Sequence, residues 1–287
     1  MFVHRYTLHS RRATTREGAL LRVDDGFADV HPWPELGDPP LDEQLALLAR
    51  GETTPLTRAS LRLAALDADA RRRGVSLFDG LTIPLSHWPG NDPPAGFDTI
   101  KTKGVADFPP HVRIRIDFNA RLTPDEFLRI AETLPRERID FIEDPCPYDE
   151  VTWRELRQRT GLRLAYDVPT LAEDAKRRAR LQPAPAVQGA PPFEIRIHKP
   201  ALQTDWPRHN DVVVTSYMDH PVGQFGAAYI AATHETNARC GLFTHVLYEP
   251  DAFLERVESD GARLLPPRGT GIGFDDLLER LPWNLLS

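Results

Sequence analysis

The chain is poor in several features that would each indicate a particular class of protein. It has no run of roughly 18 apolar residues that could cross a membrane, and its amino-terminal segment, MFVHRYTLHSRR, lacks the apolar stretch of a signal peptide. The two cysteines, Cys146 and Cys240, are too far apart for a metal-binding pair. A formal net charge of −7 argues against nucleic acid or an anionic membrane as the main partner. We therefore expect a cytoplasmic protein with two free thiols.

Lysine is also scarce, since only four of the 35 basic residues are lysine and the others are arginine. Arginine serves where a permanent positive charge is enough, whereas lysine is needed where an amine must release a proton. Lys101, Lys103 and Lys199 lie in strand-like segments, and Lys176 lies in a basic helical segment. Four residues are too few for statistics, so this pattern only directs attention to the three strand lysines.

The 287 residues suffice for one large α/β barrel or for two domains. Residues 2–30 have the texture of β-strands, and two helical stretches follow. In the second stretch, apolar residues recur at helical spacing from Leu61 onward, and Gly74 is a plausible end of the helix. We predict an α+β domain over residues 1–80, a barrel over 81–260, and a C-terminal segment over 261–287 that returns toward the first domain.

From residue 81 onward, short β-like segments alternate with helices or loops. The candidate strands are 81–86, 97–103, 111–119, 139–145, 162–167, 193–200, 211–217 and 241–245. Helix starts are predicted at Thr123, Thr152 and Thr170, each followed three residues later by Glu. This order predicts a (β/α)₈-type barrel whose functional residues lie at the C-terminal ends of the strands. The connections at 104–110 and 201–211 are too short for a full crossover, so one or two outer helices should be missing or reduced.

Charged residues end five successive candidate strands. In chain order they are Lys101 with Lys103, Asp117 with Asn119, Glu143, Asp167 and Lys199. Because side chains alternate between the two faces of a strand, both members of each pair point the same way. Three carboxylates at one barrel mouth repel each other unless a cation lies among them, and oxygen ligands favour Mg²⁺ or Mn²⁺ over zinc. Lysines beside such a cation should favour a neutral amine that can act as a base.

Each of these residues, taken alone, also has an ordinary structural explanation. A single Asp or Glu after a strand is most often a helix cap or a surface residue, and an isolated Lys-x-Lys is usually a solvated strand edge. Ser216 is a weaker candidate for contact with a substrate carboxylate, because a Ser at a strand end is more often a cap. The succession of five strand ends, each with a suitable residue type, favours the catalytic explanation.

The same segments resemble the enolase superfamily and, within it, the muconate-lactonizing-like o-succinylbenzoate synthases. The motifs are KTK at 101–103, DFN at 117–119, IEDP at 142–145, the Asp of AYD at 167, and HKP at 198–200. Other segments resemble the capping domain's last helix and substrate-covering loop, and the synthases' seventh-strand region and C-terminal stretch: 65–74, 27–38, 215–223 and 266–274. The resemblance covers nearly the whole chain and implies a (β/α)₇β barrel with an N-terminal capping domain.

The resemblance implies a chemical role for each residue. The ligands of Mg²⁺, or of Mn²⁺, would be Asp117, Glu143 and Asp167. Lys103 would abstract the proton α to a substrate carboxylate and then act as an acid when hydroxide leaves, with Lys101 lowering its pKa. Lys199 would stabilise the enediolate, and Asn119 would orient a metal ligand. The product would be o-succinylbenzoate, an intermediate of menaquinone synthesis.

Two other functions stay open at this point. A racemase or epimerase of N-acylamino acids or dipeptides would use the same ligands, with Lys103 and Lys199 as two opposed bases. A dipeptide epimerase should also place carboxylates for a substrate ammonium near the last strands, where Asp219 is the one obvious candidate. A non-catalytic barrel that binds a carboxylate or a protein is disfavoured, because buried charges cost stability. We expect a small carboxylate substrate as the partner, and the sequence predicts no oligomeric state.

Overall fold

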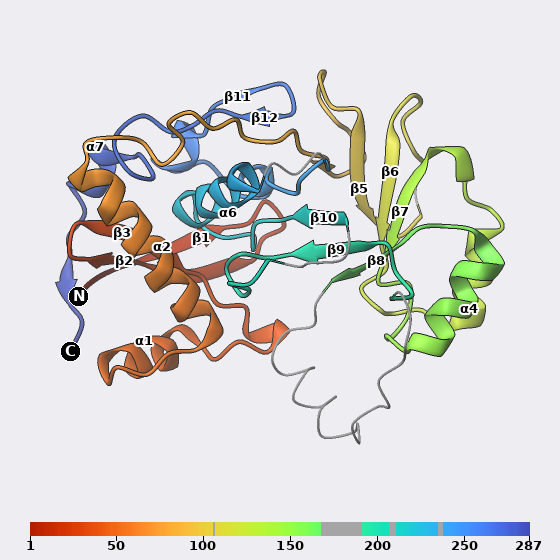
Figure 1. Ribbon diagram of the computed structural model, residues 1–287, viewed down its shortest axis with the longest axis horizontal. Coiled ribbons are helices and arrows are strands. Elements are labelled where there is room, and N and C mark those ends of the chain that lie inside the picture. The colour runs from red at the N-terminus through yellow and green to blue at the C-terminus, as the bar shows by residue number, and fades with distance from the viewer. Residues whose placement is uncertain (106, 168–190, 207–210, 235–237) are drawn as a thin grey trace.

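The structure is a computed structural model that describes residues 1–105, 107–167, 191–206, 211–234 and 238–287. Its strands form two main sheets that lie side by side (Figure 1), and a third, small sheet has two strands. One main sheet has four strands and contains both ends of the chain, and the other has seven strands and carries the predicted charged residues.

The four-stranded sheet is antiparallel, in the order β13-β1-β2-β3. Its strands are β1 (Phe2–His9), β2 (Thr15–Val23), β3 (Gly26–Val30) and β13 (Asn284–Leu285), and the helices beside it are α1 (Leu41–Ala49) and α2 (Pro55–Arg72). A capping box at Thr54 starts α2, and Gly74, with φ of 67°, follows its end as the sequence predicted. The strands over 2–30 and the second helix are therefore confirmed.

The seven-stranded sheet is parallel and curls into a half-barrel in the order β10-β9-β8-β7-β6-β5-β4. Its strands are β4 (Trp88–Pro89), β5 (Thr99–Lys103), β6 (Arg113–Asp117), β7 (Ile139–Glu143), β8 (Leu164–Asp167), β9 (Ile195–His198) and β10 (Asp211–Val214). Buried side chains such as Ile114, Ile142 and Leu164 form the core beneath it. The predicted α/β barrel class is confirmed.

Two of the eight predicted strands, 81–86 and 241–245, do not form strands in the structure. Residues 81–86 form only a single bridge, at Ser86, and the first strand of the sheet is β4, which begins at Trp88. Residues 241–245 contribute single bridges, which pair Cys240 with Ser86 and Gly241 with Thr215. Backbone hydrogen bonds at these bridges join the two edges of the curled sheet, so residues 240–241 occupy the position of the eighth strand.

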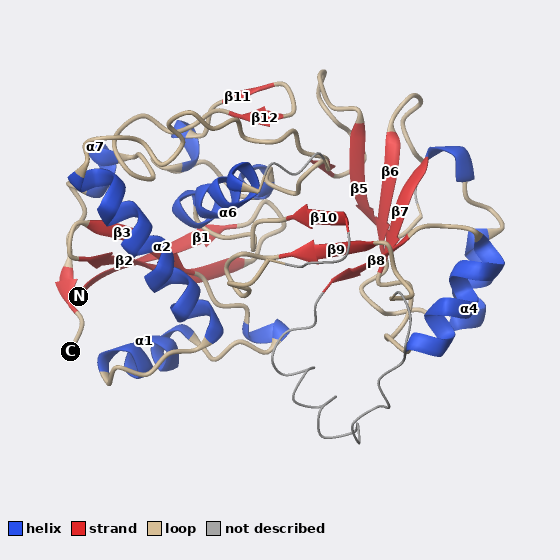
Figure 2. Cartoon of the chain, in the orientation of Figure 1, coloured by secondary structure: helices blue, strands red, loops and turns tan. Residues whose placement is uncertain are grey.

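The helices of the barrel confirm one predicted start and correct another. Thr123 caps α3 (Pro124–Ala131) in a full capping box. The prediction at Thr152 was wrong, because Asp149 caps α4 (Glu150–Thr160) and accepts a hydrogen bond from the Thr152 N–H. The start predicted at Thr170 lies outside the described residues. In the described part of the chain, a further helix of several turns is α6 (Pro221–Thr233) (Figure 2).

The two short connections behave as predicted where they are described. Their described residues contain no helix; these are 104–105 and 107–110 in the first connection, and 201–206 and 211 in the second. The remaining elements are short: η1 (Pro34–Leu36), η2 (Arg136–Arg138), η3 (Thr244–Leu247), η4 (Leu254–Arg256), β11 (Ser259–Asp260), β12 (Arg263–Leu264) and α7 (Asp275–Leu278). Among the described residues, no helix combines the length and the apolar character that a bilayer crossing requires. Both cysteines are buried free thiols, as expected.

Candidate active site

The register of the parallel sheet brings the charged strand ends together. Lys103 on β5 pairs with Asp117 on β6, and Asp117 pairs in turn with Glu143 on β7. Asp167 is the last residue of β8, and Lys199 directly follows β9. Because all five strands are parallel, their C-terminal ends share one rim, and every strand-end residue that the sequence singled out lies there. These positions agree with the predicted constellation.

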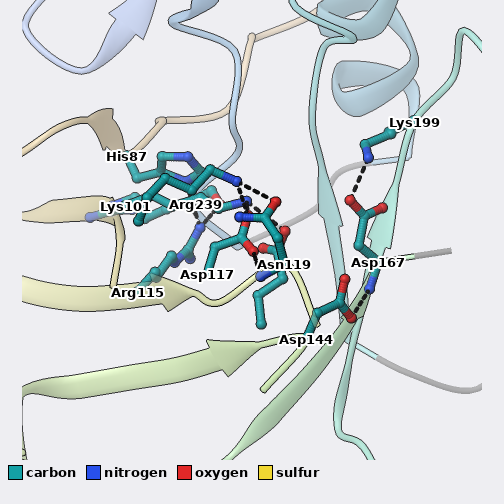
Figure 3. A network of polar contacts seen from close by, with 11 residues as sticks. His87, Lys101, Arg115, Asp117, Asn119, Asp144, Asp167, Lys199 and Arg239 are labelled. Atoms are coloured by element: carbon teal, nitrogen blue, oxygen red, sulfur yellow. Dashed lines mark hydrogen bonds and ion pairs between the residues drawn. The ribbon is translucent and has the colours of Figure 1, made fainter. Parts of the chain in front are cut away.

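Lys101 lies at the centre of the first group of contacts (Figure 3). Its Nζ donates to Glu143 Oε1 at 2.6 Å and lies 3.1 Å from Asp117 Oδ2. The Nζ of Lys103 donates to Asp117 Oδ2 at 2.6 Å and to Asn119 Oδ1 at 2.8 Å. The side chain of Lys101 is 18% exposed and that of Lys103 is 58% exposed, so Lys103 is the amine that a bound substrate can reach.

Lys199 forms a second group with Asp167 on the other side of the site (Figure 3), and the two side chains form an ion pair. Behind them, Asp144 Oδ1 accepts a hydrogen bond of 3.1 Å from the Asp167 backbone N–H. Asp144 was missed in the sequence, because alternation assigns it to the strand face opposite Glu143. Its φ of 43° breaks that alternation and turns the residue toward β8.

Burial and mutual repulsion shape the ionisation of the carboxylates. Burial, together with the charge of Asp117, raises the pKa of Glu143 to about 7, although Lys101 opposes the rise. Burial likewise raises the pKa of Asp144, with the charges of Asp167 and Glu143 adding to the effect. Asp117 differs, because the effect of Lys101 and Lys103 exceeds that of burial and lowers its pKa. The rim therefore holds more carboxyl groups than can easily be ionised at the same time.

The neighbouring carboxylates shape the ionisation of Lys101 and Lys199. Burial alone would lower the pKa of Lys101, but Asp117 and Glu143 outweigh it and raise the pKa. The same balance, with Asp167 as the partner, raises the pKa of Lys199. In this structure, both lysines are therefore held as ammonium ions, because they supply the positive charge that the carboxylates require.

The donor set fits a hard divalent cation. Glu143 Oε2 and Asp167 Oδ1 are buried and have no hydrogen-bond partner among the described residues, which is costly for carboxylate oxygens unless a cation binds them. Carboxylate oxygens are the ligands that Mg²⁺ prefers. Within the described ranges, no group of three or more His, Cys, Asp or Glu side chains is arranged to hold a metal as it stands. Each candidate ligand instead directs one oxygen at a lysine.

Two further residues that the sequence predicted, Asn119 and Ser216, lie outside the lysine–carboxylate pairs. The backbone N–H of Asn119 donates to Asp117 Oδ1 at 2.8 Å, so Asn119 contacts both Asp117 and Lys103. Ser216 is buried, and its Oγ lies 2.6 Å from Thr244 Oγ1. Its contact with a substrate stays a prediction.

A second residue that sequence reasoning missed is Arg115, which is 2% exposed on the same face of β6 as Asp117. It donates to Asp140 Oδ2 at 2.8 Å, to His87 Nδ1 at 2.9 Å and to Arg239 O at 2.6 Å (Figure 3). The sequence did carry a signal for Arg115. It lies two residues before Asp117, and alternation along a strand directs both side chains to the same face.

Comparison with known proteins agrees with this geometry. The profile of the o-succinylbenzoate synthase N-terminal domain matches residues 1–70, and that of the enolase C-terminal domain-like family matches residues 96–188. An o-succinylbenzoate synthase of Bdellovibrio bacteriovorus is 35% identical, over 96% of this chain and 93% of that relative. The chain belongs to the o-succinylbenzoate synthase family of the enolase superfamily. As a member of this family, it is an enzyme of the carbon–oxygen lyase class.

More distant relatives support the family and the fold. An o-succinylbenzoate synthase of Thermobifida fusca is 26% identical, over 84% of this chain and 78% of that relative. Among solved structures, a dipeptide epimerase of Cytophaga hutchinsonii in complex with Mg and a dipeptide has a TM-score of 0.71 at 14% identity, covering 100% of this chain and 98% of its own. A mandelate racemase/muconate lactonizing protein of Herpetosiphon aurantiacus also gives 0.71, at 16% identity over 99% and 97%. At these identities the structures establish the fold alone.

Proposed function

We propose that the chain is an o-succinylbenzoate synthase that removes water from a cyclohexadiene carboxylate with the aid of Mg²⁺, in the cytoplasm and on the route to menaquinone. One observation carries the proposal. Lysines from opposite sides of the rim, on β5 and after β9, converge on carboxylates that end the strands between them. The 35% identity to a named synthase over almost the whole chain favours this reaction among those that such a rim could perform.

The metal would be held through the oxygens that the lysines leave free, on Asp117, Glu143 and Asp167. When bound, Mg²⁺ would supply positive charge for the substrate carboxylate. The α-proton of such a carboxylate is weakly acidic, so the site must stabilise the negative charge that develops during its removal. The half-buried Lys101 contacts two carboxylates, and this suits it to balance charge within the site.

Lys103 is the residue that would move the protons. Its exposed amine would accept the α-proton of the substrate, and the resulting ammonium would return a proton to the hydroxyl group on the adjacent carbon. The carbon–oxygen bond then breaks, and the hydroxyl leaves as water. Lys199, held as an ammonium by Asp167, would remain charged and stabilise the negative charge on the carboxylate oxygens.

No contact of the site favours the alternative of racemisation or epimerisation. A racemase would use Lys199 as a second base, but Lys199 pairs with Asp167 just as Lys103 pairs with Asp117, so these contacts do not distinguish the two reactions. Asp219, the candidate for a substrate ammonium, is 3% exposed and lies against Gly223 together with Asp29. The 35% identity to a named synthase therefore supports the lyase assignment.

The proposal is tested by adding the cyclohexadiene substrate and Mg²⁺ to the purified protein. We expect formation of o-succinylbenzoate, and we expect Lys103→Arg to abolish it with little change in Mg²⁺ affinity, because guanidinium cannot accept the proton. Lys176→Arg, the same change at the lysine outside the strand set, controls for the loss of an amine. Racemisation of N-acylamino acids without dehydration would disprove the proposed reaction, and an active Lys103→Arg would disprove the assignment of the base.

A further inference from the structure

The segment over residues 31–38, which follows β3 and which we call the capping loop, contacts the barrel at Tyr217. The indole Nε1 of Trp33 donates to the backbone carbonyl of Tyr217 at 2.9 Å. The hydroxyl of Tyr217 donates to Asp38 Oδ2 at 2.9 Å, and the backbone N–H of Trp33 donates to the same oxygen at 2.9 Å. Both the main chain and the side chain of Tyr217 therefore hold the loop.

These contacts are buried, which makes them strong relative to surface contacts. Tyr217 is 1% exposed and Asp38 is 5% exposed. A hydrogen bond to a buried carboxylate stabilises more than one between neutral groups, and a polar group that loses such a partner inside the protein is costly. The outer side of the loop is held as well, since the Arg16 guanidinium lies 4.1 Å from the Trp33 ring centroid and pairs with Glu35.

The ring of the same tyrosine lies beside Lys199. The Lys199 Nζ is 5.9 Å from the centroid of the Tyr217 ring, within the range of a cation–π contact. The side chain of Lys199 is 15% exposed, so its amine is confined between this ring and the carboxylate of Asp167. Tyr217 thus contacts the capping loop through its hydroxyl and the Lys199 amine through its ring.

We propose that Tyr217 is a positioning residue that couples closure of the capping loop to the placement of the Lys199 amine. When the loop is closed, Asp38 and Trp33 fix the tyrosine from two directions, and the fixed ring limits where Lys199 can lie. When the loop opens, the tyrosine loses both contacts and the amine is held by Asp167 alone. The inference rests on the role proposed above for Lys199, and it adds a link between loop closure and charge stabilisation.

Three variants separate the two halves of this link. Tyr217→Phe removes the hydroxyl that holds Asp38 and keeps the ring, whereas Tyr217→Leu removes both. Tyr248→Phe is the matched control, because Tyr248 is 3% exposed and its hydroxyl donates to the Met218 carbonyl instead of to the loop. For each variant we would measure melting temperature, backbone hydrogen exchange over residues 31–38, and kcat and KM for dehydration.

We expect exchange over 31–38 to rise by about tenfold in Tyr217→Phe, from the loss of a hydrogen bond to a carboxylate, with KM raised and kcat within about twofold of the parent. Tyr217→Leu should show the same exchange and a kcat lower by about tenfold or more, because a misplaced catalytic group loses rate steeply. Tyr248→Phe should leave exchange and both kinetic constants unchanged. If Tyr217→Leu does not fold, Tyr217→Met fills the same space with a flexible side chain.

Two results would overturn the inference. Exchange over 31–38 in Tyr217→Phe that matches Tyr248→Phe would show that the hydroxyl does not hold the loop. A kcat that is equal in Tyr217→Phe and Tyr217→Leu would show that the ring does not position Lys199. A parent protein that forms no o-succinylbenzoate would instead disprove the proposed function, and the exchange measurement would still decide whether Tyr217 holds the loop.

Discussion

Glu143→Gln should protect the metal-free protein from part of the stability that the parent loses as the pH rises from 4.5 to 8, even though Glu143 is a proposed metal ligand. Glu143 is 1% exposed, and burial with repulsion from Asp117 raises its pKa to about 7 from an ordinary value of 4.5. A raised pKa means that the folded state disfavours the ionised carboxylate. The neutral amide of glutamine has nearly the same shape and removes this unfavourable ionisation.

The magnitude follows from the size of the pKa shift. A rise from 4.5 to about 7 corresponds to about 3 kcal/mol of unfolding free energy. Below pH 4.5 the carboxyl is protonated in both the folded and the unfolded state, so it adds no penalty. Between pH 4.5 and about 7 the unfolded state ionises the carboxyl while the folded state keeps it protonated, so the parent loses stability across this range and Glu143→Gln does not.

The assay is urea unfolding of the parent and of Glu143→Gln at pH 4.5 and pH 8, both in chelator. The new amide N–H₂ at the unpartnered Oε2 position costs about 1–3 kcal/mol, but this cost is the same at both pH values and cancels in the comparison. The stability difference, variant minus parent, should increase by about 3 kcal/mol between pH 4.5 and pH 8. A difference that stays constant, or falls, would refute the ionisation argument.

Three further changes test neighbouring parts of the structure. Asp167→Asn should weaken Mg²⁺ binding measured by calorimetry, and unchanged affinity would exclude Asp167 as a ligand. Lys101→Met should lower the unfolding free energy in chelator by about 3–5 kcal/mol, because it leaves Glu143 without its cation; a loss below 1 kcal/mol by urea unfolding would contradict this. Gly223→Ala should cost about 1–3 kcal/mol, since its Cβ would lie 2.7 Å from oxygens of Asp29 and Asp219, and an unshifted melting temperature would show that these move freely.

The features that the sequence predicted well depend on neighbours in the chain. The capping box at Thr123 involves residues three apart, so it can be recognised from sequence alone. The orientation of the charged strand ends also follows from local alternation, and the structure places all five strand ends on one rim. The helix start at Thr152 failed for a local reason too, because Asp149 accepts both the N–H and the hydroxyl of Thr152 and begins the helix earlier.

The features that escaped prediction depend on distant parts of the chain. The edges of the sheet are joined by two single bridges, Thr215 with Gly241 and Ser86 with Cys240. Their residues lie more than 20 and more than 150 positions apart in the sequence, so no local pattern encodes them. Arg115 is buried because Asp140, His87 and a carbonyl at 239 satisfy its guanidinium, and none of these is adjacent in sequence. Likewise, no propensity predicts that Tyr217 contacts Asp38, which lies 179 residues away in the sequence.

The scarcity of lysine acquires a physical meaning in the structure. Each of the three strand lysines pairs with a carboxylate that would otherwise lie uncompensated at the rim. Because an ammonium is compact and sits on a flexible stem, it can move away from such a carboxylate more readily than a planar, forked guanidinium can. Glu143 and Asp167 each keep one buried oxygen that no lysine contacts, and these oxygens would hold Mg²⁺. Each of these carboxylates would then serve a lysine with one oxygen and the metal with the other, so the lysines would balance charge at the rim whether or not Mg²⁺ is bound.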